Sequence, residues 1–352
     1  MIRFKPWAAR WVPPRLLSRA LTLVVPMAWA AAAVAYRLTC PLARDDALSA
    51  RLVSSAVLCT VITGLVMHVR RTMLRELRRV RGIAEAAQSV LLRPPPPRVD
   101  GLAVAAVHLS ADRGARIGGD LYEVIATEHG VRAVIGDVRG HGLGAVRTVA
   151  AVLGSFREAA HDEARLEDVL RRLERAMARH LRERAHAGSD PEAAEDFVTV
   201  LLLEILPGGA VRALNCGHPW PHLLAGAGAD PLARTDPLPP LGLFPLPSEL
   251  SPLPCGRLRP GDALVLHTDG AEEARDTEGR FFPLRDVLTE AAHANPLTPQ
   301  TVLRTVLTAL LRHSAGPPKD DVALLVLRNE RHPRHSAPGL RPCARATADR
   351  LQ

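Results

Sequence analysis

The spacing of hydrophobic positions changes several times along this chain. Near its start, two stretches without charged residues run from Ala20 to Tyr36 and from Leu52 to Val69. Each has roughly the 17 to 25 residues that a membrane-spanning helix needs. We therefore predict two transmembrane helices, at residues 20–36 and 52–69, joined by an external loop at 37–51. The alternatives are a cleaved signal peptide for the first stretch and a helical hairpin buried in a soluble domain.

Basic residues flank this hairpin on both sides. The segment 1–19 carries Arg3, Lys5, Arg10, Arg15 and Arg19, and the second stretch is followed by Arg70, Arg71, Arg75, Arg78, Arg79 and Arg81. Because Lys and Arg accumulate on the cytoplasmic side of membrane helices, both ends of the hairpin should face the cytoplasm. The sequence thus predicts a multi-pass protein of the cell membrane with a cytoplasmic N-terminus and a cytoplasmic main domain.

A linker follows the hairpin. From Arg70 to Leu92 apolar residues recur at helical spacing, which predicts a charged amphipathic helix. Four prolines at positions 94–97 then stop the helix and favour a stiff, extended spacer. We assign residues 70–97 to this linker. Three roles are open for its helix: a tether, a segment on the membrane surface, or the contact between two copies in a homodimer. The helix is too short for the sustained heptads of a coiled coil.

Strand and helix patterns alternate beyond the spacer. Short apolar runs predict single strands within 101–111 and within 320–330, and a strand that runs into a loop within 261–274. Two hairpins are also predicted, one with its turn at His129–Gly130 and the other with its turn at Pro207–Gly209. Helical periodicity marks 145–160, 166–184 and 298–314. The many hairpins favour an α+β fold, an antiparallel β-sandwich flanked by helices, over a doubly wound parallel sheet. This domain should span 98–329, and the aperiodic tail at 330–352 is predicted to be disordered.

Composition narrows the class of partner. The chain has 352 residues and a formal net charge of +8, a balance that suits nucleic acid or an anionic membrane surface. The arginines gather beside the apolar stretches and in the tail, which favours the membrane and argues against nucleic acid. Five cysteines without C-x-x-C spacing indicate neither a cysteine-based zinc site nor a disulfide framework.

Aspartates stand at strand ends or in Gly-rich turns at four places in the main domain. They are Asp120 in GGDLYEV, Asp137 in IGDVRGHG, Asp269 in HTDGAEEA, and Asp320 with Asp321 in KDDVALLVL. A single such aspartate is usually a turn former, whereas four together suggest a site for a hard cation such as Mg²⁺ or Mn²⁺. Two ions about 3.5 to 4 Å apart that share one carboxylate can activate water against a phosphate ester. The residues therefore predict a metal-assisted phosphate ester hydrolase.

The order and spacing of several segments resemble a known family. The segments are GGDLYEV, VIGDVRGHGLGA, NCGHPWPHLL, PLGLF, LRPGDALVLHTDGAEEARD and DDVALLVLR. Together they resemble the bacterial SpoIIE-like branch of the PPM metal-dependent serine/threonine protein phosphatases. The resemblance implies two packed antiparallel sheets flanked by helices, two Mn²⁺ or Mg²⁺ ions, and hydrolysis of phosphoserine or phosphothreonine. It further implies a phosphorylated anti-sigma-factor antagonist of a partner-switching system as the substrate.

The resemblance also implies roles for individual metal ligands. Asp137 would bridge the two ions, Asp120 and the backbone carbonyl of Val138 would serve one, and Asp269 and Asp320 would serve the other. With these roles, Asp137 and Asp120 would be the catalytic residues, because they would hold the ions that activate the water.

Further residues of these motifs have supporting roles. Gly119 and Gly270 would let the backbone turn beside the metals, with Asp321 hydrogen-bonding a strand end. His218 in NCGHPWP is expected to be structural. Arg139 stands where eukaryotic relatives have a histidine and His141 lies two positions on, so these two are the candidates to bind substrate phosphate. Arg139 cannot donate a proton at neutral pH, which leaves water to protonate the leaving oxygen.

Other functions remain as alternatives. A pseudophosphatase scaffold usually lacks a metal carboxylate, and here all four places are filled. The segment DVRGHGLGA resembles the Asp-x-Gly-x-Gly loop of histidine-kinase ATP-binding modules, but the sequence shows neither their Asn-bearing helix nor their second Gly-rich lid. A membrane-anchored globular protein without catalysis is the third alternative.

Overall fold

The computed structural model describes residues 35, 57–58, 60–76, 91–109, 118–140, 142–186, 196–314, 316, 318 and 320–331. The chain forms two compact units, Met1–Gly82 and Ile83–Gln352, which are treated separately below.

The described part of the first unit is helical. Residues 57–58 and 60–76 adopt helical conformation and so cover parts of the predicted second transmembrane stretch and of the linker helix. Among the described residues, no helix combines the length and the apolar character needed to cross a bilayer. The predicted first transmembrane stretch lies outside the described residues apart from Ala35, and the external loop and the tail from residue 332 also lie outside them.

Two antiparallel sheets form the centre of the second unit. The first sheet has the order β1-β2-β11-β10-β7-β8 and the second has the order β3-β4-β5-β6-β9. Strands of the first sheet are β1 Arg98–Val99, β2 Leu102–Leu109, β7 His222–Ala225, β8 Gly228–Pro231, β10 Ala263–His267 and β11 Val322–Asn329. Strands of the second are β3 Asp120–Thr127, β4 Gly130–Val138, β5 Val198–Ile205, β6 Ala210–Cys216 and β9 Leu253–Arg257.

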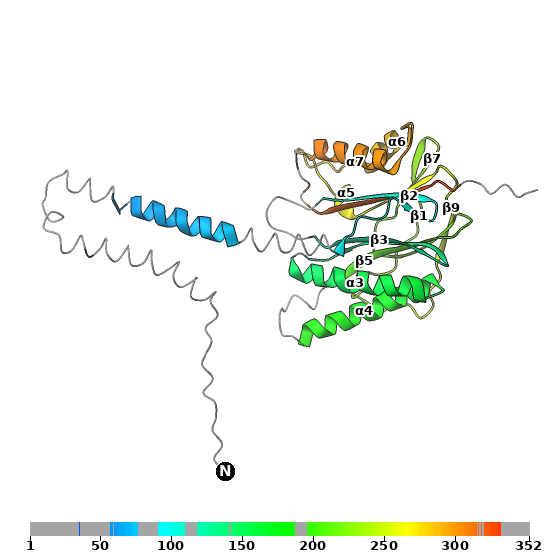
Figure 1. Cartoon of the computed structure of the whole chain (residues 1–352), viewed down its shortest axis with the longest axis horizontal. Coiled ribbons are helices and arrows are strands. Elements are labelled where there is room, and N and C mark those ends of the chain that lie inside the picture. Colours follow the sequence, from blue (N-terminus) through cyan, green and yellow to red (C-terminus); the bar gives the residue numbers. More distant parts are fainter. Residues whose placement is uncertain are drawn as a thin grey trace, which may run out of the picture. The chain divides into compact units, whose positions relative to one another are not determined.

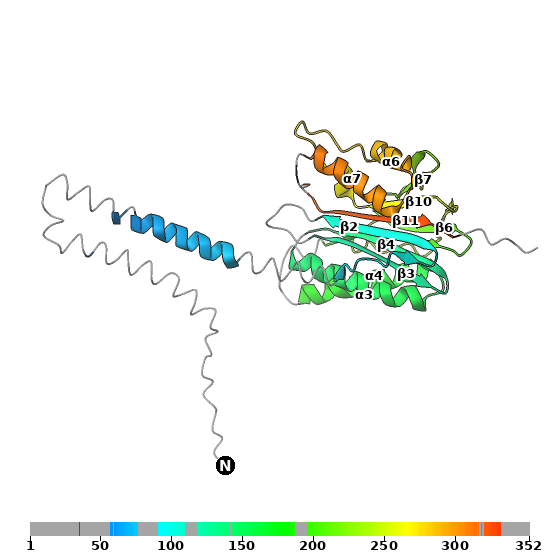
Figure 2. The same ribbon diagram turned by 45° about the horizontal axis from the view of Figure 1, so that its top comes forward.

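Helices cover the outer faces of both sheets (Figures 1 and 2). Helices α3 and α4 pack on the second sheet, and α6 and α7 pack on the first. Their bounds are α3 Leu143–Asp162, α4 Leu166–His186, α6 Leu284–Ala292 and α7 Pro299–His313, with the short α5 at Asp269–Glu272. The α+β sandwich of two antiparallel sheets flanked by helices, predicted from the hairpins, is confirmed.

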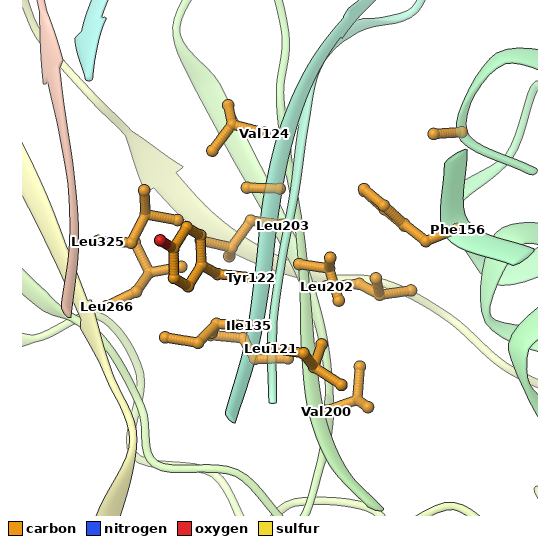
Figure 3. Close-up of a cluster of buried hydrophobic side chains, with 14 of the residues drawn as sticks. Leu121, Tyr122, Val124, Ile135, Phe156, Val200, Leu202, Leu203, Leu266 and Leu325 are labelled. Carbon is orange, nitrogen blue, oxygen red and sulfur yellow. The ribbon is translucent and has the colours of Figure 1, made fainter. Parts of the chain in front are cut away.

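Alternating side chains of the second sheet fill two hydrophobic layers. Adjacent residues of a strand point to opposite faces, as Leu121 and Tyr122 of β3 do. Figure 3 shows Tyr122 beside Leu266 and Leu325 of the first sheet, while Leu121 points toward the side of Phe156 on α3. All of these side chains are buried. Because both faces of the second sheet are covered, its strands read as nearly continuous apolar runs in the sequence.

The sequence patterns missed several short elements between β6 and α7. The hairpin of β7 and β8, strand β9 and helix α6 were not predicted, and α5 occupies a place expected to be loop. Each of these strands has only four or five residues. Such short strands, set among many prolines, carry too little periodicity to be distinguished from irregular chain.

A buried arginine joins the second sheet to its helices. Arg132 of β4 is 0% exposed. Its Nε and Nη2 atoms donate to Oε1 of Glu204 on β5 at 3.0 and 2.8 Å. The same guanidinium also donates to the backbone carbonyls of Ala160 at 2.9 Å and Ala164 at 2.8 Å. These carbonyls lie at the end of α3 and in the turn that follows, where a helix leaves its last carbonyls without intrahelical partners.

We expect Arg132→Ala to lower the free energy of unfolding by about 3–5 kcal/mol, because it leaves the Glu204 carboxylate buried without its main partner. Urea unfolding followed by circular dichroism measures this change. The matched control is Arg212→Ala, whose side chain is 53% exposed and lies 3.8 Å from Glu204. Removing such an exposed partner should cost less than about 1 kcal/mol. Equal losses in the two variants would contradict this account of Arg132.

Candidate metal centre

The hairpin of β3 and β4 brings two of the predicted aspartates together. Asp120 is the first residue of β3, and Asp137 is the residue before the last of β4. The two are direct partners in the antiparallel register. Asp120 is only 1% exposed, so its carboxyl group is almost completely removed from water. The hairpin therefore places two carboxyl-bearing residues side by side at its open end.

Strands β10 and β11 bring further carboxylates to this place. Asp269 follows β10 directly as the first residue of α5, and Asp320 is an exposed residue just before β11. Thr268 connects these segments: its Oγ1 accepts from the backbone N–H of Ala323 at 2.9 Å and donates to Oδ2 of Asp120 at 3.3 Å. The end of β10 is thus tied both to β11 and to the hairpin that carries Asp120.

Two glycines permit the close approach of backbone and carboxylate. A Cβ atom at Gly119 would lie 2.3 Å from the carbonyl oxygen of Val138 and 2.8 Å from Oδ1 of Asp137. At Gly270 it would lie 2.0 Å from the carbonyl oxygen of Asp321. Real Cβ atoms do not approach other atoms this closely, so both positions require glycine. The Val138 carbonyl and the Asp137 carboxylate consequently face the same space.

Burial and neighbouring carboxylates raise the pKa of Asp120, Asp137 and Asp269. Burial, and after it the charges of Asp269, Asp320 and Asp321, raises the pKa of Asp137 to about 7. Burial and the charges of Asp137, Asp321 and Asp269 raise the pKa of Asp120 well above its usual value. Like charges held this close favour protonation unless a cation offsets them. A set of carboxylates and a backbone carbonyl offers only hard oxygen donors, which suits Mg²⁺ or Mn²⁺.

His108 belongs to this cluster and was missed in the sequence. Its Nε2 atom lies 3.7 Å from Oδ2 of Asp120 and is buried without a hydrogen-bond partner. Burial lowers the pKa of His108, and the nearby charge of Asp321 opposes this effect. His108 lies opposite Ala323 in the β2–β11 register, so only that long-range pairing shows that it faces the aspartates.

His218 has the structural contacts expected of it. Its backbone N–H and carbonyl are both held by the side-chain amide of Asn215 at 2.8 Å. Its ring nitrogens contact Oγ1 of Thr199 at 3.0 Å and the backbone carbonyl of His267 at 3.1 Å. Oγ1 of Thr199 in turn accepts from the backbone N–H of Asp137 at 3.2 Å. His218 therefore connects the strand that carries Asp137 with the end of β10.

The two predicted phosphate-binding residues differ in what the structure shows. Arg139 is exposed directly after β4, and its guanidinium carbon lies 5.4 Å from the centroid of the Phe197 ring. The backbone N–H of Arg139 donates to the carbonyl of Phe197 at 2.9 Å. His141 lies outside the described residues.

Comparisons with known proteins show the family and the fold of this chain. The family model described as Stage II sporulation protein E (SpoIIE) matches residues 127–330 of the 352, which include Asp137, Asp269 and Asp320. Among solved structures, the SiaA-PP2C domain of Pseudomonas aeruginosa matches with a TM-score of 0.54 and 16% identity, over 72% of this chain and 97% of that chain. This likeness shows the fold.

Two further solved structures match at lower TM-scores. The RsbU and RsbW domains of Rv1364c from Mycobacterium tuberculosis match with 26% identity and a TM-score of 0.49, over 67% of this chain and 61% of that chain. The phosphatase domain of SpoIIE from Bacillus subtilis, solved with a fragment of its regulatory domain, matches with 17% identity and a TM-score of 0.49, over 64% of this chain and 62% of that chain. The chain thus spans less than two thirds of both proteins.

The raised pKa of Asp137 predicts how pH acts on the metal-free protein. A carboxyl group whose pKa rises from 3.8 to about 7 on folding stabilises the fold fully at low pH and loses this contribution as pH rises through that window. We therefore expect the contribution of Asp137 to the metal-free free energy of unfolding to decrease between about pH 4 and pH 7, which the difference between the unsubstituted chain and Asp137→Asn isolates. Asp137→Asn should unfold at a higher temperature than the unsubstituted chain at pH 7.5 when metal is absent.

Added Mn²⁺ should reverse this order. Mn²⁺ at a concentration of about 100 times its dissociation constant should raise the free energy of unfolding of the unsubstituted chain by about 2.7 kcal/mol. The same concentration should raise that of Asp137→Asn far less. Thermal unfolding with and without Mn²⁺ measures both effects. The exposed Asp236 provides the control Asp236→Asn, which should behave like the unsubstituted chain. An equal response of Asp137→Asn and Asp236→Asn to Mn²⁺ would show that the cluster does not bind the ion.

Proposed function

This chain belongs to the SpoIIE family of PPM-type protein serine/threonine phosphatases, which are metal-dependent hydrolases, and from this membership we propose how and where it acts. It hydrolyses phosphoserine or phosphothreonine of a protein at the cluster of Asp120, Asp137, Asp269 and Asp320. Two Mn²⁺ or Mg²⁺ ions are the cofactors.

The observation that carries the proposal is that segments from both sheets bring carboxyl groups to one place, where the pKa of Asp120 and of Asp137 is raised. Four segments from both sheets contribute carboxyl groups, and the pKa of the central Asp137 reaches about 7. Such a concentration of negative charge fits divalent cations of total charge +4 better than a single ion. Asp137 would hold both ions, Asp120 and the Val138 carbonyl one of them, and Asp269 and Asp320 the other. When bound, two such ions acidify a water molecule and polarise the phosphoryl oxygens.

Residues of the chain itself orient the substrate. Arg139 is the cationic side chain at the end of β4, next to the carboxylates, and its planar guanidinium suits bidentate contact with phosphate. It does not move a proton at neutral pH. His218 and Thr199 act as positioning residues, because they hold the backbone of Asp137 against the segment that carries Asp269.

We further propose that the substrate is a phosphorylated anti-sigma-factor antagonist of a partner-switching system. Membership of the SpoIIE family supports this assignment. The full set of carboxylates speaks against a pseudophosphatase scaffold. The segment that resembled a nucleotide-binding loop is the end of β4 in an antiparallel sandwich, and the family match accounts for it.

The membrane assignment remains part of the proposal. Two uncharged stretches at 20–36 and 52–69, each flanked by arginines, support a two-helix anchor with the N-terminus and the phosphatase domain in the cytoplasm. The linker helix would then lie between membrane and catalyst, where contact between two copies could form a homodimer.

Phosphate release from a phosphoserine protein should depend on Mn²⁺ or Mg²⁺ in the full chain. Asp137→Asn and Asp320→Asn should each lower kcat/KM at least about 100-fold, because loss of a metal ligand removes several kcal/mol of transition-state stabilisation. Asp236→Asn is the matched control with unchanged activity. Turnover that persists after chelation, or that survives both cluster substitutions, would contradict the proposed mechanism.

Membrane association should survive alkaline carbonate. We expect the full chain to remain in the membrane pellet after a carbonate wash and to need detergent for release. A chain that begins at residue 83, the start of the second compact unit, is the control and should stay in the supernatant. Release of the full chain by carbonate would exclude a spanning anchor.

A further inference from the structure

A second group of metal-ligating side chains lies on the first sheet. His222 of β7 pairs in register with Val265 of β10, and His267 lies two residues further along β10, so both histidines share one face. Val265 packs into the hydrophobic cluster formed with α6 and α7. The histidines therefore lie on the helix-covered outer face of the first sheet, whereas Asp120 and Asp137 belong to the second sheet.

The third member comes from the short helix α5. One nitrogen of each histidine and one carboxylate oxygen of Glu272 all lie within 4.8 Å of one another. Nε2 of His267 is 3.7 Å from Oε1 of Glu272. Around a tetrahedral zinc ion with bonds of about 2.0–2.1 Å, ligand atoms stand about 3.3 Å apart. Small side-chain movements would therefore bring all three ligand atoms into range of one ion.

Both histidines have a ring nitrogen that needs a partner. Nδ1 of His222 and Nε2 of His267 are buried without a hydrogen bond. The residues are 5% and 1% exposed, so water does not readily replace the missing partners. Nδ1 of His267 lies 3.3 Å from the backbone carbonyl of Thr268, to which it can donate a hydrogen. In the tautomer that donates this hydrogen from Nδ1, Nε2 keeps a lone pair, and this is the form that binds metal.

Solvent reaches this group from one side. The Glu272 side chain is 47% exposed. It lines a pocket of about 460 Å³ together with Glu273 and residues 281–286. An ion could enter by this pocket, and a water molecule could occupy a fourth position.

We propose that His222, His267 and Glu272 form a zinc site distinct from the carboxylate cluster. Two imidazoles and one carboxylate are a ligand set that zinc accepts with water as the fourth ligand. Imidazole donors favour zinc over Mg²⁺, Mn²⁺ and other hard cations, which the oxygen-only cluster suits.

The position of the site suggests regulation of the catalyst. The segment from His267 to Glu272 begins and ends with a zinc ligand and carries Asp269 between them. Bound zinc would hold this segment in one conformation, and the affinity of the carboxylate cluster for Mn²⁺ should change with zinc occupancy.

Zinc affinity of the full chain, measured by competition with a chromophoric chelator, tests the site without any assay of activity. We expect one zinc ion per chain to persist in excess Mg²⁺ and in Asp137→Asn. Co²⁺ at this site should give the visible absorption of a tetrahedral complex. Glu272→Gln should weaken zinc binding at least about 100-fold. Loss of a direct ligand should lower the affinity more than loss of a residue that only hydrogen-bonds a ligand, which typically costs about 10–100-fold. The exposed Glu249, which lies outside this group and its pocket, gives the matched control Glu249→Gln, with unchanged affinity.

His222→Asn provides a second test at a buried ligand, with circular dichroism to verify folding. Zinc affinity that is unchanged in both Glu272→Gln and His222→Asn would overturn the proposal. So would an equal loss in Glu249→Gln, or the disappearance of zinc binding in Asp137→Asn. Because each readout is binding, these outcomes are independent of whether the chain proves to be a phosphatase.

Discussion

Repulsion between carboxylates is the constraint that the rest of the second unit must satisfy. Burial and the charges of neighbouring carboxylates raise the pKa of Asp120 and Asp137, and Asp120 is almost fully buried. Such a cluster opposes folding. The apolar layers on both faces of the second sheet supply the stabilisation that offsets it, and a tight β-hairpin leaves the two central aspartates no freedom to separate. A cation bound at this cluster would therefore stabilise the fold by offsetting the repulsion.

The cluster also depends on how the two sheets are placed against each other. Asp120 and Asp137 belong to the second sheet, whereas Asp269 and Asp320 adjoin strands of the first. Polar contacts cross between the sheets at this point, from Thr268 to Asp120 and from Thr199 through His218 to the His267 carbonyl. Hydrophobic packing is not directional, so by itself it does not fix how one sheet is positioned against the other. These hydrogen bonds, which are directional, fix the relative position of the two sheets at the cluster.

Local patterns were sufficient where partners are close in sequence. The two-residue turn at Glu128–His129 determines the register of its hairpin, and that register places Asp120 opposite Asp137. Pairings between distant strands could not be read in the same way. His108 meets the aspartates through the β2–β11 pairing, and His222 meets His267 through β7–β10. The residues adjacent to these histidines in the sequence do not indicate which residues lie near them in the fold. The short, proline-rich region before β10 had no periodicity from which its strands could be recognised.

Strand β11 has a consequence for the time at which activity can begin. It lies between β2 and β10 in the middle of the first sheet, although it is the last strand in the sequence. Since a ribosome delivers the chain from its N-terminus, β2 and β10 emerge without the strand that joins them. Asp320 emerges just ahead of that strand. The carboxylate cluster is therefore incomplete until almost the whole domain has been synthesised, and translation products truncated before residue 320 lack one of its members.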